Sequence, residues 1–220
     1  MAKEYKLKII KDEKETEDIK KILVEKPEGF SFIPGHSVMI SLPEAPNEKR
    51  PFTITSTNHD DFIEFMIKKY PGGMSEKLFY LKEGNEIILS DIFGSMRYNG
   101  KGIFIAGGSG ITAFISIFRH LQMEKGNEGN FLIFSCKKAS EILRENELRE
   151  IFGKNVIFTL TREKKEGYEC GRVDESFLRK HIKDFGLKIY ACGPGNFSED
   201  ITNCFNACLA LDDKKKAQDI

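Results

Sequence analysis

The second half of the chain contains four short, almost wholly apolar segments, at residues 103–106, 131–135, 156–160 and 189–192. The stretches between them carry helical patterns. After the first segment, for example, apolar residues recur at i, i+3, i+4 and i+7 from Ile111. Short apolar strands that alternate with helices are typical of a parallel sheet covered on both faces. We therefore expect residues 101–220 to form an α/β domain with a doubly wound parallel sheet, ending in a solvated tail over 212–220.

The first half of the chain has a different pattern. Six of the seven prolines lie within residues 27–71, among short segments with a period of two, such as 5–9, where apolar residues alternate with lysines, and 63–67, where Ile63, Phe65 and Ile67 recur at every second position. Short alternating strands punctuated by proline and glycine are typical of an antiparallel barrel or sandwich. We expect residues 1–98 to form an antiparallel β-barrel domain, interrupted by one helix that begins near Ser75.

Composition excludes several classes of function. The 34 basic and 34 acidic residues balance, so no overall charge attracts nucleic acid or an anionic membrane. The longest apolar run, 103–118, contains glycine, serine and threonine and is too short to span a bilayer. The five cysteines lack the spacing of metal ligands, and residues 1–26 do not resemble a secretory signal. We expect a cytoplasmic protein with free thiols, no membrane span and no metal site.

A glycine turn directly follows the first apolar segment. Gly108 and Gly110 lie in this turn, and Ile111 and Thr112 open the helix after it. Glycines let the backbone approach a diphosphate, and the start of a helix offers unpaired N–H groups and a positive dipole end. The pattern favours a nicotinamide dinucleotide site. The alternative is a turn shaped only by packing.

The end of the next strand carries no acid that would hold the ribose hydroxyls of NAD. The second apolar segment ends in Ser135, Lys137 and Lys138, and the third is followed by Arg162. Hydroxyl, lysine and arginine side chains suit the dianionic 2′-phosphate of NADPH, so NADPH is favoured and NADH stays open. The alternative is that these cations only solvate the strand ends.

The first domain offers two further candidate sites for a phosphate-bearing ring. In one, Arg50 would pair with phosphate, Phe52 would cover a flat ring face and Thr53 would hydrogen-bond a ring heteroatom. In the other, a glycine turn opens a helix and forms a second potential diphosphate cradle, with Tyr70 and a nearby lysine as candidates for flanking an adenine. Its residues are Lys68, Gly72, Gly73, Met74 and Ser75.

Four motifs in this order resemble those of the ferredoxin–NADP reductase-like flavoproteins, and the resemblance covers nearly the whole chain. The motifs are Arg50-Pro51-Phe52-Thr53, the Gly72-Gly73-Met74-Ser75 turn, the glycine turn 107–112 and Cys192-Gly193-Pro194. The resemblance implies an N-terminal FAD-binding barrel followed by a nicotinamide-nucleotide-binding domain. FAD is preferred to FMN because a glycine turn that opens a helix suits a pyrophosphate.

The resemblance also implies roles for individual residues. Arg50 would bind the flavin pyrophosphate, Phe52 would lie on the isoalloxazine face and Thr53 would contact the N5 edge. The turn from Gly73 to Ser75 would bind the diphosphate.

In the second domain, the resemblance assigns Gly108, Gly110 and Thr112 to the nicotinamide dinucleotide. Cys192 would place its thiol beside the carbon that loses hydride, so Cys192 and Thr53 are the expected catalytic residues.

The sequence departs from the family pattern in ways that bear on the electron acceptor. Phe52 stands where tyrosine is usual and Ala113 where proline is frequent. The sequence ends without the aromatic residue found in many plant-type members, and it has no cysteine array for an iron–sulfur cluster. Plant-type ferredoxin specificity is therefore in doubt, and electrons must pass to a separate acceptor.

The leading hypothesis is a flavin-dependent oxidoreductase that accepts hydride from NAD(P)H and passes electrons to a separate acceptor. The acceptor would be a ferredoxin, a flavodoxin, another redox protein or a small molecule. Two alternatives remain: an electron-transfer subunit that acts only within a larger redox complex, and a non-catalytic nucleotide-binding regulator.

Overall fold

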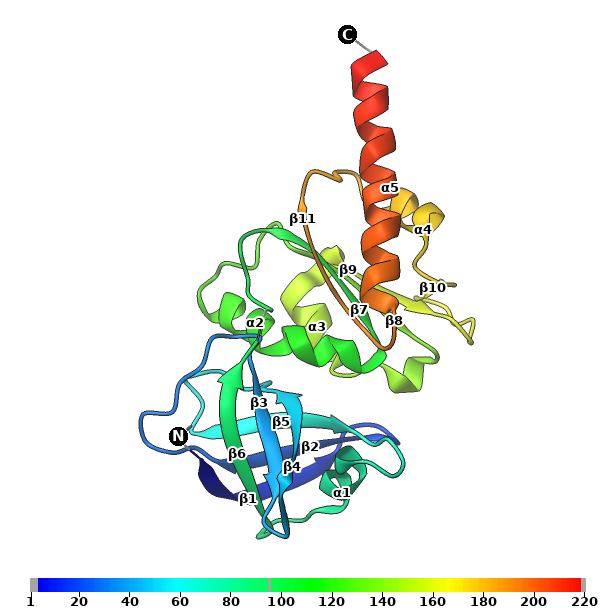
Figure 1. Ribbon diagram of the computed structural model, residues 1–220. Coiled ribbons are helices and arrows are strands. Elements are labelled where there is room, and N and C mark those ends of the chain that lie inside the picture. The colour runs from blue at the N-terminus through cyan, green and yellow to red at the C-terminus, as the bar shows by residue number, and fades with distance from the viewer. Residues whose placement is uncertain (1–3, 95, 219–220) are drawn as a thin grey trace. The chain divides into compact units, whose positions relative to one another are not determined.

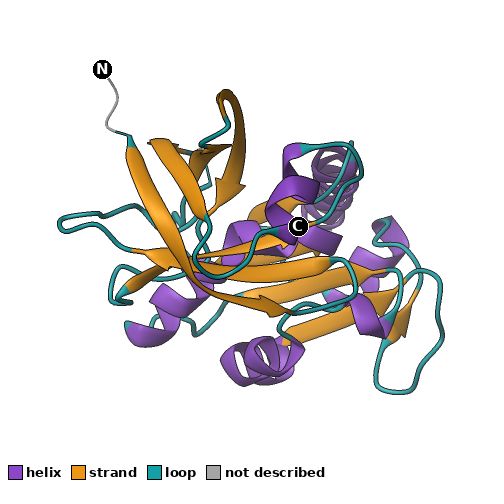
Figure 2. Ribbon diagram, turned by 90° about the horizontal axis from the view of Figure 1, so that it is seen from below, coloured by secondary structure: helices purple, strands orange, loops and turns teal. Residues whose placement is uncertain are grey.

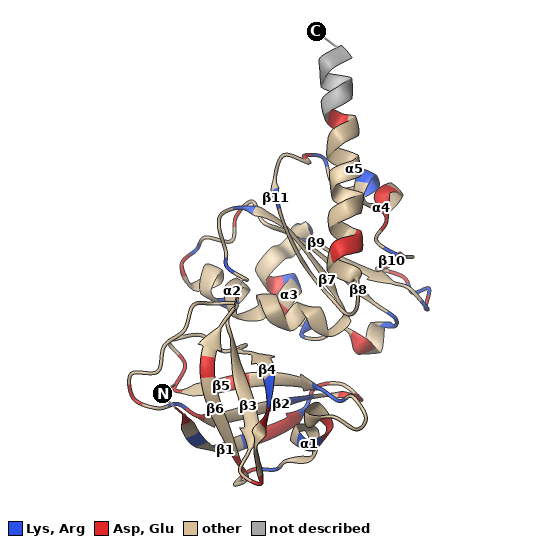
Figure 3. Ribbon diagram, viewed as in Figure 1, with Lys and Arg blue, Asp and Glu red and all other residues tan. Residues whose placement is uncertain are grey.

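The computed structural model describes residues 4–94 and 96–218, with side chains as far as residue 212. The chain divides into two compact units (Figure 1). One unit comprises residues 1–99 and 112–124, and the other comprises residues 100–111 and 125–220. Acidic and basic residues are intermixed in both units (Figure 3).

The first unit contains a six-stranded antiparallel sheet in the order β4-β3-β6-β1-β2-β5. Its strands are β1 (Tyr5–Lys14), β2 (Ile19–Glu25), β3 (Ser37–Leu42), β4 (Ala45–Thr53), β5 (Phe62–Lys68) and β6 (Glu86–Phe93). Just beyond β4, the Thr55 N–H donates to the Glu64 carbonyl of β5 at 2.9 Å, which brings the two edge strands together. The sheet thus rolls into the expected barrel around a core that includes Ile22, Val38 and Phe65.

One short helix, α1 (Met74–Tyr80), interrupts the barrel between β5 and β6, where the sequence predicted a helix near Ser75. Met74 and Leu78 lie one turn apart on this helix and are buried in the barrel core. The core therefore fixes the start of α1 and the glycine turn before it.

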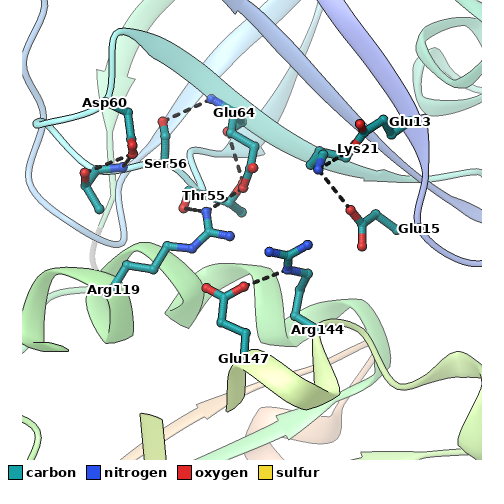
Figure 4. Close-up of polar contacts among 11 residues, drawn as sticks. Glu13, Glu15, Lys21, Thr55, Ser56, Asp60, Glu64, Arg119, Arg144 and Glu147 are labelled. Atoms are coloured by element: carbon teal, nitrogen blue, oxygen red, sulfur yellow. Dashed lines mark hydrogen bonds and ion pairs between the residues drawn. The ribbon is translucent and has the colours of Figure 1, made fainter. Parts of the chain in front are cut away.

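The helix α2 (Thr112–Met123) belongs to the first unit by its contacts, although the sequence analysis grouped it with the second half. The Arg119 guanidinium donates to Glu64 at 2.6 Å and to the Thr55 carbonyl at 2.8 Å (Figure 4). The Ser116 hydroxyl accepts the Gly35 N–H at 2.9 Å. These bonds join residues 55 to 81 positions apart, so a local sequence pattern could not have shown them.

The second unit contains a five-stranded parallel sheet in the order β10-β9-β8-β7-β11. Its strands are β7 (Gly102–Gly107), β8 (Phe131–Cys136), β9 (Val156–Leu160), β10 (Glu169–Cys170) and β11 (Lys188–Cys192). Four of them are the predicted apolar segments, whose limits differ by at most one residue. The order of the strands reverses between β7 and β11, which is the switch point at which open α/β sheets bind ligands.

Helices and helical turns connect these strands: η1 (Gly108–Ile111), η2 (Ala139–Glu141), α3 (Glu145–Phe152), η3 (Gly153–Asn155), α4 (Glu175–His181) and α5 (Phe197–Gln218). Figure 2 shows helices on both sides of the parallel sheet. Phe177 of α4 and Phe205 of α5 share a core with Ile105 and Ile133 of the sheet. The doubly wound fold predicted from the sequence is therefore confirmed.

The helix α5 runs to Gln218, so most of the expected solvated tail is helical; residues 219–220 lie outside the described part. Within the described residues, no helix has both the length and the hydropathy that crossing a membrane requires.

Candidate flavin and nucleotide sites

The flavin motif Arg50-Pro51-Phe52-Thr53 forms the end of β4, next to β3. Phe52 is half-buried and packs against the barrel core, which leaves part of its ring accessible. Arg50 and Pro51 are exposed. The strand therefore presents a cation and an aromatic ring two residues apart.

The Arg50 guanidinium has no acidic partner among the residues that the structure describes. It donates to the adjacent Lys49 carbonyl at 2.9 Å, whereas the Lys49 ammonium is paired with Glu4 at 2.8 Å. A free, exposed guanidinium can bind a phosphate with two parallel hydrogen bonds. The exposure of the Arg50 guanidinium and its lack of an acidic partner therefore fit the predicted role at a flavin pyrophosphate.

Thr53 lies opposite Ser37 of β3, and their hydroxyl oxygens are 3.2 Å apart. The sequence analysis missed Ser37. In the sequence, Ser37 is only a hydroxyl residue that follows Pro34-Gly35-His36. Its pairing with Thr53 depends on the register of β3 and β4, which the sequence does not show. Two neighbouring hydroxyls can hold each other in position, so Ser37 is suited to orient the hydroxyl of Thr53 towards a ring edge.

The Gly72–Ser75 turn is partly closed by its own hydrogen bonds. The Gly72 N–H donates to the Glu76 carboxylate at 2.7 Å, and the Ser75 hydroxyl accepts the Tyr70 N–H at 3.2 Å. The N–H groups of Met74 and Ser75 remain as first-turn donors that α1 itself does not use. Glu76 was not foreseen, and its charge beside the turn weakens the case for a diphosphate there.

Lys68 lies at the end of β5, and its ammonium pairs with Asp18 at 3.0 Å. The predicted role of Lys68 at an adenine would require this pair to open. The structure therefore does not place a free lysine beside the Gly72–Ser75 turn.

In the second unit, the glycine turn η1 packs directly against the end of β11. A Cβ atom at Gly110 would lie 2.2 Å from the Cys192 carbonyl oxygen and 2.7 Å from the Gly193 nitrogen. Because these are backbone atoms, no side chain can be accommodated without moving the turn or the strand. The structure thus brings Gly108, Gly110, Cys192 and Gly193 together at the switch point of the sheet.

An aromatic residue that the sequence analysis did not assign completes this arrangement. A Cβ atom at Gly107 or Gly193 would lie within 3.0 Å of the Phe197 ring, at the start of α5. Pro194 accepts the Phe197 N–H at 3.2 Å and is itself exposed. Packing against Phe197 therefore explains Gly107 and Gly193, and packing against the end of β11 explains Gly110. Gly108, where an added Cβ would meet no atom within 4 Å, is left as the glycine that packing does not explain.

Ile111 and Thr112, the other two residues of the nucleotide motif, differ in the exposure of their side chains. Ile111 is fully buried, so only its backbone can contact a ligand. Thr112 is half-buried at the first position of α2.

The Cys192 thiol lies at the C-terminal end of β11 and is half-buried. Burial raises its pKa above the usual value of 9.0, so the thiol is protonated and neutral at neutral pH. A neutral thiol is a poor nucleophile. Its chemistry fits a packing and alignment role beside a ring and does not fit covalent catalysis.

The predicted 2′-phosphate residues gather at the ends of β8 and β9. Ser135 is buried in β8, and Lys137, Lys138 and Arg162 are exposed. The Arg162 N–H donates to the Lys137 carbonyl at 2.9 Å, so these two residues are neighbours. None of the three cations has an ion-pair partner within the described part of the chain, which leaves them available to an anion.

Both halves therefore fit the cofactors that the sequence suggested. The first unit offers a free guanidinium, an accessible aromatic ring and paired hydroxyls. The second offers a glycine turn, without room for a Cβ atom at Gly110, at the switch point of a parallel sheet.

Two family models match the chain, and together they cover most of it. A model of FAD-binding domains matches residues 1–90, and a model of oxidoreductase NAD-binding domains matches residues 104–203. The chain belongs to the ferredoxin–NADP reductase-like flavoproteins. The resemblance inferred from the four sequence motifs is thus confirmed.

Individual relatives of this flavoprotein are reductases. The reductase component of propane 2-monooxygenase from Mycolicibacterium smegmatis is 26% identical over 83% of this chain and 58% of its own length. NADH-cytochrome b5 reductase 2 from Candida albicans is 30% identical over 69% of this chain and 56% of its own length. The chain thus spans less than two thirds of these relatives.

Among solved structures, a ferredoxin NADP+ reductase from Neisseria gonorrhoeae with bound FAD and NADP shares the fold. Its TM-score is 0.84, its sequence identity is 18%, and the match covers 94% of this flavoprotein and 92% of that chain.

Proposed function

We propose that this flavoprotein is an NAD(P)H-dependent reductase that binds FAD on the first unit and a nicotinamide nucleotide on the second. Electrons then pass to a separate acceptor. The observation that carries the proposal is the packing of Gly110 against the Cys192 carbonyl at the switch point of the sheet. This contact supports the proposal because it brings the backbone at the end of β11 against a glycine turn of the kind that binds dinucleotides.

The residues of the first unit would bind and orient the flavin. Arg50 would pair with the pyrophosphate, Phe52 would cover a ring face, and Ser37 would orient the Thr53 hydroxyl towards the N5 edge. When bound, the flavin supplies an acceptor for hydride and can release electrons singly. The protein's contribution is alignment, because hydride transfer needs no general acid or base.

The residues of the second unit would bind the donor. The backbone N–H groups of η1 would hold the diphosphate, and the neutral Cys192 thiol would pack beside the reactive carbon of the nicotinamide. Cys192→Ser should slow flavin reduction and leave flavin content unchanged. If the flavin dissociates and the rate per bound flavin stays the same, the role given to the thiol is wrong.

The preferred donor would be NADPH. Support comes from Lys137, Lys138 and Arg162, which are exposed and lack ion-pair partners in the described structure. Measuring rates with NADPH and NADH for the wild type and Arg162→Ala tests this preference. If the ratio of the NADPH rate to the NADH rate is the same in both proteins, Arg162 does not bind the 2′-phosphate.

The acceptor would be a separate redox protein, such as a ferredoxin or flavodoxin, or a small molecule. A second candidate is an electron-transfer subunit that works only within a larger complex, which the description of one relative as a reductase component favours. Rapid reduction of ferricyanide by the isolated chain supports the first candidate. Activity that requires a co-purified subunit supports the second.

The decisive experiment is the absorbance spectrum of the purified protein before and after anaerobic addition of NADPH. We expect flavin absorbance that NADPH bleaches, with weaker FAD retention in Arg50→Ala than in the matched control Arg50→Lys. A colourless protein that does not bind added FAD would refute the proposal.

A cytoplasmic location is part of the proposal, since all five cysteines are free in the structure. Cell fractionation tests it directly.

A further inference from the structure

Two backbone hydrogen bonds join the loops that follow β8 and β9. The Thr161 N–H donates to the Cys136 carbonyl and the Arg162 N–H to the Lys137 carbonyl, both at 2.9 Å. These two bonds tie the loops to each other just outside the sheet, whose regular pairing ends at Cys136 and Leu160. They fix the backbones of Lys137 and Arg162 side by side.

Glu163, the next residue, bonds through its side chain to the backbone of the other loop. Its carboxylate accepts the Ala139 N–H at 2.7 Å, at the first residue of η2. Lys138 precedes this turn and provides no side-chain cap. Glu163 thus supplies, from the β9 loop, the acceptor that the start of η2 lacks.

Because Glu163 bonds to the Ala139 N–H, it does not pair with the cations beside it. A carboxylate among exposed lysines and arginines commonly forms ion pairs, as Glu145 does with Arg149 at 2.7 Å. Within the described residues, Glu163 forms no such pair with Lys137, Lys138 or Arg162. The carboxylate binds the η2 backbone to the β9 loop and does not neutralise the charges beside it.

We propose that Glu163 is a positioning residue for the 2′-phosphate of NADPH. Its bond to Ala139 holds the β8 and β9 loops together, so that Lys137 and Arg162 meet one phosphate group as a preformed pair. This inference rests on the proposed function, since it assumes that the nucleotide binds across these strand ends. It adds a residue that never touches the ligand.

The test is calorimetric titration of the flavoprotein with adenosine 2′,5′-bisphosphate and with 5′-AMP, which differ in the 2′-phosphate. Glu163→Ala should weaken binding of the bisphosphate about tenfold, the effect of one charge-assisted hydrogen bond. Affinity for 5′-AMP should stay within about twofold. Glu163→Gln should restore most of the difference, because the amide oxygen can accept the same N–H.

The matched control is Glu166→Ala, which removes one exposed acid from the same loop. If Glu163 acted only by its charge, Glu163→Ala, Glu163→Gln and Glu166→Ala would all strengthen binding of the bisphosphate, and the inference would be wrong. Equal affinities of the wild type and Glu163→Ala would also overturn it.

Failure of the inference is distinguishable from failure of the proposed function. A wild type that binds both nucleotides equally would refute the preference for NADPH, and the role of Glu163 with it. Flavin content and bleaching by NADH would still report whether the protein is a flavoprotein reductase.

Discussion

The two glycine turns of this protein look alike in sequence and differ in structure. Gly110 is enclosed, because a Cβ atom there would meet the Cys192 carbonyl at 2.2 Å. Gly73 is open, because the nearest atom to a Cβ would be the Tyr70 carbonyl oxygen at 3.8 Å. The first turn needs glycine for the fold. The second turn has open space around its glycines, so substitution can distinguish the two turns.

Gly110→Ala is expected to have the largest effect. The added methyl would collide with backbone atoms, so we expect a loss of about 3 kcal/mol in the free energy of unfolding, at the upper end for overpacking. Denaturant titration measures this loss. Nucleotide affinity should fall at least about tenfold while FAD remains bound. If Gly110→Ala were as stable as the wild type, η1 would be able to shift, and the contrast between an enclosed turn and an open turn would be wrong.

Gly72→Ala tests backbone conformation in the open turn. Gly72 has a φ of +76°, and a Cβ atom added there would meet no other atom within 4 Å, so the cost should be left-handed strain alone, about 1 kcal/mol. Gly72→Asn is the matched control, since asparagine tolerates this conformation. If the asparagine variant loses as much stability as the alanine variant, conformation is not the cause.

Gly73→Ala should change the stability of the FAD-free protein by no more than about 0.5 kcal/mol, because Gly73 caps α1 with φ −110° in open space. Its informative readout is FAD affinity, measured by fluorescence titration. A marked loss of affinity would place the flavin diphosphate at this turn in spite of Glu76. Unchanged affinity would move the diphosphate elsewhere.

The smallest expected effect concerns the Cys192 thiol beside the enclosed turn. Burial raises its pKa in the folded state, so folding favours the protonated thiol. Its contribution to stability is complete below the usual value of 9.0 and is lost as the pH rises through the higher pKa of the folded state. This loss of stability is measured by comparing the denaturation midpoints of the wild type and Cys192→Ser from pH 7 to pH 10. Parallel curves would contradict the assignment.

The sequence predicted the parallel sheet well because buried strands carry their own signal. The four apolar segments around Ile105, Phe134, Phe158 and Tyr190 became β7, β8, β9 and β11. Burial on both faces demands continuous apolar runs, and such runs are visible without any partner.

The candidate site was predicted less completely, because several of its features depend on long-range pairing. Ser37 reaches Thr53 through strand register, Lys68 is held by Asp18, and Glu163 caps a turn 24 residues earlier. From the sequence alone, each of these polar side chains could equally well have been exposed to solvent without a partner. Only the fold reveals which partner each one has.

The pair that Arg119 forms with the buried Glu64 determines how the halves of this protein can be exchanged with those of its relatives. Because α2 is bonded to the barrel, the nucleotide-binding unit is encoded by two stretches, 100–111 and 125–220, on either side of a helix that belongs to the other unit. A chimera joined once, near residue 100, would import a foreign helix opposite Glu64 and leave that carboxylate without its cation, at a cost of about 3–5 kcal/mol. Grafting a new donor specificity therefore requires two inserted segments and a retained α2.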